Sequence, residues 1–172
     1  MILKGSERGH AKELANHLML GAENEHIELH DLRGFVSDDL HGAMQESAAI
    51  AKGTRCKNHL FSLSLSPPQH EDVPVEVFEA AIGRIEGELG LDGQPRAIVF
   101  HEKEGRRHAH VVWSRIDPVA MKAINLSHYK NKLNSLAKDI YLEHGWSLPE
   151  GMKDKTLSDP LNFSHAEWQQ AL

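Results

Sequence analysis

Two apolar runs around a short polar turn, near residue 100, constrain the fold of this chain more than any other feature. The runs are RAIVFH (96–101) and HAHVVWSRI (108–116), and EKEGR follows the first of them. Two strands joined by a Gly-containing turn predict an antiparallel hairpin. Because this hairpin lies within a series of alternating strands and helices, the sequence predicts an α+β fold and excludes a doubly wound parallel sheet.

The other elements follow from apolar periodicity and from capping residues. Strands are expected at 1–4, 26–32 and 58–66, and helices are expected to begin at Ser6, Ser37, Pro74 and Ser127. The order of elements favours a sheet with helices packed mainly on one face. The strand at 58–66 alternates strictly, so Ser62, Ser64 and Ser66 are expected to line an open polar face.

Composition indicates one globular domain. The chain has 172 residues, of which 40% are hydrophobic, and no apolar run reaches the ~18 residues of a membrane-spanning helix. The single cysteine, Cys56, excludes an internal disulfide framework, and the absence of a secretory leader predicts a cytoplasmic protein. We expect the domain to occupy 1–150. Residues 151–172 would be an extension, the start of a longer protein or what remains of a shortened one.

Charge is distributed unevenly along the chain. The net charge of −6 by itself argues against a nucleic-acid partner. However, residues 96–138 carry nine bases and three acids, and a local field matters more to a polyanion than the net charge does. This basic stretch predicts a surface that contacts phosphates.

Three of the thirteen histidines, His101, His108 and His110, lie within ten residues of the predicted hairpin. Residues two apart on a strand point to the same face, and His101 can reach the same point from the neighbouring strand. Three imidazoles so placed can bind one divalent ion and leave positions open for substrate. Glu102 or Glu104 could orient one of the rings. The alternative is that these are ordinary surface histidines.

The run VFHEKEGRRHAHVVWSRID resembles the three-histidine motif of the DNA relaxases, the plasmid mobilisation nucleases of the HUH endonuclease superfamily. FSLSLSPP resembles their second motif, and KELANHLML resembles the first, which carries the nucleophile. The resemblance covers about residues 1–150. It implies a five-stranded antiparallel sheet, a divalent ion (Mn²⁺ or Mg²⁺, with Zn²⁺ also compatible) on His101, His108 and His110, and nicking of single-stranded DNA at a transfer origin.

One departure from the family pattern concerns the nucleophile. Most relaxases have tyrosine in the first motif, whereas this chain has His17 at the matching position and no tyrosine before Tyr129. Some branches use histidine, so the resemblance implies His17 as the nucleophile, with Tyr129 as the alternative. Leu14 and Leu18 would pack beneath His17. Glu104, three residues after His101, resembles the catalytic acid of another branch. A partly buried structural role for His17 is equally compatible with the sequence.

DNA contacts are expected from the serine strand and from the basic stretch: Ser62, Ser64, Arg106, Arg107, Arg115, Lys130 and Lys132. The resemblance further implies hairpin or single-stranded transfer-origin DNA, relaxosome accessory proteins, a type IV secretion coupling protein and passage into the recipient bacterium with the DNA. Two other functions stay open. One is a catalytically inactive metal-binding DNA module, and the other is a three-histidine hydrolase acting on a small phosphoester.

Overall fold

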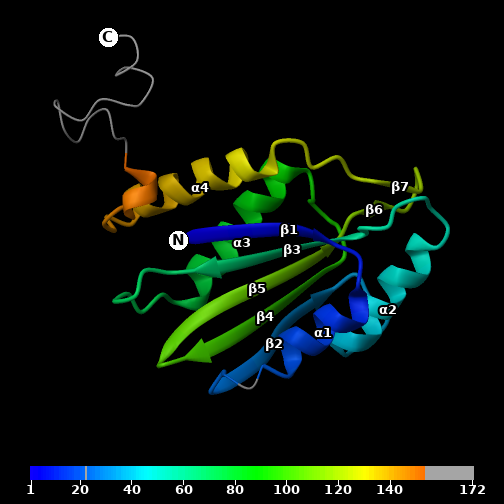
Figure 1. Cartoon of the computed structure of the whole chain (residues 1–172), viewed down its shortest axis with the longest axis horizontal. Helices are drawn as coiled ribbons and strands as arrows, with labels where there is room; N and C mark the ends of the chain where they lie inside the picture. Colours follow the sequence, from blue (N-terminus) through cyan, green and yellow to red (C-terminus); the bar gives the residue numbers. More distant parts are fainter. Residues whose placement is uncertain (22, 154–172) are drawn as a thin grey trace, which may run out of the picture.

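A computed structural model describes residues 1–21 and 23–153 of the protein (Figure 1). Its centre is a five-stranded sheet in the order β1-β3-β5-β4-β2, in which every neighbouring pair is antiparallel. The strands are β1 (Ile2–Arg8), β2 (His26–Arg33), β3 (Leu60–Ser66), β4 (Arg96–Lys103) and β5 (Arg106–Ser114). The predicted α+β class and five-stranded antiparallel sheet are therefore confirmed.

Four helices cover the sheet: α1 (Ala11–Met19), α2 (Leu40–Ala51), α3 (Val75–Leu89) and α4 (Tyr129–Glu143). They pack on both faces, whereas the sequence analysis expected mainly one. Strands β3, β4 and β5 are apolar on both sides, so each face needs a cover. Phe61, Phe100 and Trp113 meet α3 and α4, while Leu60, Val99 and Val112 meet α1 and α2.

Three predicted helix starts are corrected, one of them at Ser127, since α4 begins at Tyr129 with His128 as its N-cap. The sequence placed a cap at Ser6, but β1 continues to Arg8 because Ser6 pairs with Ser62 in the sheet, and α1 begins only at Ala11. The second helix is capped by Asp39, whose carboxylate accepts from the Gly42 N–H at 2.6 Å. Pairing with a distant strand thus overrides a local capping signal in β1.

The predicted hairpin is confirmed and is tighter than the sequence indicated. Strands β4 and β5 are joined by Glu104 and Gly105 alone, with φ of 53° and 70°. Two consecutive positive φ values are typical of the two-residue turns that match the twist of the flanking strands. A small second hairpin, β6 (Ile116–Asp117) and β7 (Lys122–Ala123), was not predicted.

The remaining segments add little to the site. A short 3-10 helix, η1 (Glu150–Met152), follows α4. Across 1–21 and 23–153, no helix is both long and apolar enough to cross a membrane. Most of the extension expected at 151–172 lies outside the described residues, so the proposed domain boundary near 150 stays a prediction.

Candidate active site

The three hairpin histidines lie together on the sheet face that carries α1 and α2. His101 pairs directly with His108 across β4 and β5, and His110 is the diagonal neighbour of His101. The rings of His101 and His110 are 4.4 Å apart between centroids. The antiparallel register therefore brings together side chains that are separated by up to nine positions in the sequence.

Hydrogen bonds fix which ring nitrogen of two histidines carries a lone pair. His101 Nε2 donates to the backbone oxygen of Leu18 at 2.6 Å, so its Nδ1 has the lone pair and accepts from Asn24 at 3.3 Å. His108 Nε2 accepts from Arg106 at 3.3 Å, so Nδ1 donates to the Ser66 hydroxyl at 3.2 Å. Partners of this kind set the tautomer of a histidine ligand.

Burial keeps these imidazoles neutral. It lowers the pKa of His108, with smaller contributions from nearby cations, and it lowers the pKa of His101 despite the bond to Leu18. Burial and the neighbouring His101, His108 and His17 lower the pKa of His110 to about 4. Neutral imidazole is the form that binds metal ions, so all three rings present the required donor at neutral pH.

The donor nitrogens do not yet point at one centre. In the described part of the chain, no three histidine, cysteine or acidic side chains converge closely enough to hold a metal ion. Instead, Asn24 and Arg106 occupy the lone pairs of His101 and His108. The residues fit a divalent ion by their chemistry and shared face, provided that these two polar groups give way.

His17 lies beside this cluster. It is exposed in the last turn of α1, while Leu14 and Leu18 are buried beneath it, as expected from their spacing. The next residue, Leu18, accepts a hydrogen bond from His101 Nε2 at 2.6 Å, so α1 holds His17 next to a residue that contacts the cluster. The structure thus brings the predicted nucleophile to the predicted metal ligands.

The alternative nucleophile is not brought there. Tyr129 starts α4 and packs edge-on against Phe61, with ring centroids 5.2 Å apart, on the opposite face of the sheet. Glu104 is exposed in the hairpin turn and lines a pocket of about 480 Å³ together with His108, Arg106 and His70. His70 was missed, because a lone histidine in a loop after two prolines gives no periodic signal.

The predicted DNA contacts divide between the two faces. Ser64 pairs with His110 and Ser62 lies two residues further along β3, so both hydroxyls share the histidine face. Arg106 also lies there. Arg107 packs over the Phe100 ring on the other face, at 5.5 Å. Lys130 and Lys132 are exposed on α4, which covers that other face as well.

The basic stretch 96–138 does not form one surface, which corrects the expectation from its charge count. Arg96 is half-buried between Asp31 and Glu86, at 2.9 Å and 2.7 Å. Arg115 is 8% exposed and binds backbone oxygens of Asn58 and Ile124. A sum of charges along the sequence cannot show which basic side chains are buried and paired with other groups of the protein.

Comparisons with known proteins agree with this geometry. Residues 14–146 match the sequence profile of a family described as "Relaxase: MobA/VirD2-like, nuclease domain". The fold is similar to a Mn-bound crystal structure, at pH 6.8, of the MobM relaxase domain bound to plasmid pMV158 oriT DNA, with TM-score 0.57 and 11% identity over 100% of both chains. A second such structure, at pH 5.5, gives TM-score 0.53 and 13% identity, again over 100% of both chains. No curated protein matches the chain. Because the profile covers well over half of the sequence, the chain belongs to the relaxase family.

Proposed function

We propose that this protein nicks one DNA strand at a transfer origin by metal-assisted transesterification and stays covalently bound to the 5′ end. The observation that carries the proposal is that His101, His108 and His110 share one sheet face of a relaxase nuclease domain, and that His101 contacts Leu18 beside His17. The similar MobM domain is Mn-bound and in complex with oriT DNA, which supports the same substrate class and a divalent ion here.

His101, His108 and His110 would hold the ion. When bound, a divalent ion supplies positive charge to the non-bridging oxygens of the scissile phosphate. The bond from His108 Nδ1 to Ser66 leaves the lone pair on Nε2, which would bind the ion once Arg106 withdraws. The bond from His101 to Leu18 ties the β4 end of the site to α1, the helix that carries His17.

His17 would be the nucleophile. A neutral imidazole nitrogen forms a bond to phosphorus while the bond from phosphorus to the 3′ oxygen breaks. The ring then loses its N–H proton to solvent, and the departing 3′ oxygen takes up a proton to become a hydroxyl. Glu104, which lines a pocket with His108, would accept or deliver such a proton.

Substrate would lie over the half-buried serine strand. In residues 1–21 and 23–153, the hydroxyls of Ser62 and Ser64 have no hydrogen-bond partner, so they are available to phosphate oxygens. Arg106 adds a cation beside His108. By resemblance, we also propose accessory proteins of the nicking complex and a secretion coupling protein as partners.

A covalent-capture experiment tests the proposal. Fluorescent single-stranded oligonucleotides tiling the DNA that flanks the gene are incubated with the full chain and Mn²⁺. We expect a retarded, denaturant-resistant band that is lost in His17→Ala and after mild acid, because a phosphoramidate is acid-labile. Tyr129→Phe and Tyr141→Phe serve as controls and should keep the band.

The opposite outcomes are equally clear. An acid-stable adduct that survives in His17→Ala would move the role to a tyrosine. Specific metal-dependent DNA binding without any adduct would instead support the catalytically inactive DNA-binding module.

A further inference from the structure

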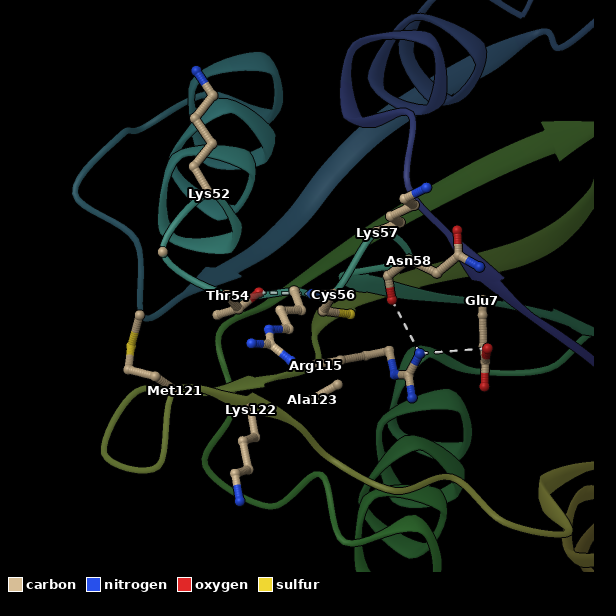
Figure 2. A pocket seen from close by; sticks show the side chains of 12 residues that line it. Glu7, Lys52, Thr54, Cys56, Lys57, Asn58, Arg115, Met121, Lys122 and Ala123 are labelled. Carbon is tan, nitrogen blue, oxygen red and sulfur yellow. Dashed lines mark hydrogen bonds and ion pairs between the residues drawn. The ribbon is translucent and has the colours of Figure 1, made fainter.

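A second basic hollow lies at the end of the sheet away from the histidines, and we call it the far pocket. It has a volume of about 970 Å³ and is formed by three separate segments (Figure 2). These are the end of β1 at Glu7, the stretch 52–58 after α2, and the region of Arg115 and the β6–β7 hairpin up to Ala123. Its position follows from the register, because Glu7 pairs with Phe61 whereas His110 pairs with Ser64.

The far pocket is strongly cationic in an otherwise acidic protein. Lys52, Arg55, Lys57 and Lys122 line it and are exposed, in a chain whose net charge is −6. Within the described residues, none of these four side chains forms an ion pair or a hydrogen bond. The pocket's one acid, Glu7, is already paired with Arg115 at 3.4 Å. The unpaired charge in the far pocket is therefore positive and exposed to solvent.

Arg115 is a buried side chain in the lining of the far pocket and holds the surrounding segments together. The residue is 8% exposed and donates to Asn58 and Ile124 backbone oxygens, both at 3.0 Å, so it ties two of the three segments together. Its Nε is buried and has no hydrogen-bond partner among the described residues. The remaining segment, the end of β1, is joined through Glu7, whose carboxylate pairs with Arg115. The exposed cations of the far pocket therefore lie on segments that are joined to one another through Arg115.

A polar track on the sheet connects the histidines with this pocket. Edge strand β1 places Lys4 opposite Ser64, Ser6 opposite Ser62 and Arg8 opposite Leu60. Directly opposed residues share a face, so Lys4, Ser6 and Arg8 lie on the histidine side. From Lys4 to Arg8 the track runs four residues along β1, or about 13 Å. It ends beside Gly9, where an added Cβ would meet Lys57 and Asn58, two residues that line the far pocket.

We propose that the far pocket binds the sugar–phosphate backbone of the same DNA strand that is processed at the histidines, at nucleotides away from the scissile phosphate. Among the residues shown to line it there is no aromatic ring to stack on a base. Contacts would therefore go to phosphates, fixing the position of the strand without reading its sequence. This inference rests on the proposed function for its substrate, but it does not require cleavage.

Salt dependence of DNA binding tests it. The protein is the full chain carrying His17→Ala, without divalent metal, and the probe is a labelled single-stranded oligonucleotide. Adding Lys52→Gln and Lys57→Gln should reduce the slope of log affinity against log salt by about 1.4, since each phosphate contact on a single strand contributes about 0.7. The matched control is Arg84→Gln with Lys138→Gln, on α3 and α4 of the opposite face, and should leave the slope unchanged. Equal slopes in all three proteins would overturn the proposal.

Cys56 provides an independent readout, because it is the single cysteine of the chain and lines the pocket. Its labelling by an uncharged maleimide should slow at least severalfold when the oligonucleotide is bound. Inorganic phosphate at the same phosphate concentration should not slow it. Equal protection by both would mean a site for small anions and would refute the DNA assignment. If the unsubstituted protein forms no covalent adduct with DNA but Lys52→Gln with Lys57→Gln still lowers the salt slope, the proposed function alone would be refuted.

Discussion

Replacing Glu86 with glutamine should destabilise the fold more than any other isosteric change on α3. One oxygen of this carboxylate, Oε1, accepts three hydrogen bonds: from Arg96 at 2.7 Å, Trp113 at 2.8 Å and Arg33 at 3.0 Å. Glu86 is 6% exposed and Trp113 is fully buried. Although burial alone would lower the pKa of Arg96, its bonds to Asp31 and Glu86 raise it. The network therefore joins α3 to three strands, β2, β4 and β5.

The loss of unfolding free energy in Glu86→Gln depends on which hydrogen bonds of the two arginines remain. Removing one partner from a buried ion pair costs about 3–5 kcal/mol. In Glu86→Gln, Arg96 retains Asp31 and Arg33 retains the backbone oxygen of Gln94 at 2.8 Å, so we expect the lower end, about 3 kcal/mol. Urea unfolding followed by tryptophan fluorescence measures the loss. Glu79→Gln, which removes an exposed contact to His30, is the control and should cost less than about 1 kcal/mol. A loss below about 1 kcal/mol in Glu86→Gln would refute this reasoning.

Three further predictions concern the hairpin and its surroundings. His108→Ala should weaken Mn²⁺ binding strongly in calorimetry, and equal binding by the wild type and a variant lacking all three hairpin histidines would rule out the site. Burial lowers the pKa of His59 in the folded protein. As the pH falls below about 6.5, the unfolded chain therefore binds a proton at His59 before the folded protein does, and the free energy of unfolding should decrease. His59→Gln should reduce that acid-side slope in urea midpoints, and an unchanged slope would count against the assignment. Gly105→Ala places a Cβ at φ of 70° and should cost about 1 kcal/mol, visible as a lower melting temperature.

Local patterns explain why the hairpin and the histidine cluster could be predicted. Alternation along β3 and β5 is a property of neighbouring residues, and it is enough to place His108 and His110 on one face, as the structure has them. The same holds for the beginning of α3, which Pro74 marks as expected. These signals need no knowledge of distant partners.

Features that depend on distant partners were missed. The extension of β1 past Ser6 needs β3, more than fifty residues later. Whether a base is free or used inside the fold also depends on the tertiary structure, as Arg96 and Arg115 show. The far pocket combines Lys57 with Lys122, which no window along the sequence would group.

The two-residue turn at Glu104 and Gly105 also has a consequence for the order in which the site assembles. A slip of one residue between β4 and β5 would turn His108 and His110 into the apolar layer beneath α3, so turn geometry and donor placement are selected together. A hairpin of this kind forms within about 1–10 μs. His17 reaches the site only when α1 packs against the sheet, where Leu18 contacts His101, 83 positions away in the sequence. Weakening that docking should therefore yield a protein that still binds metal but no longer captures DNA.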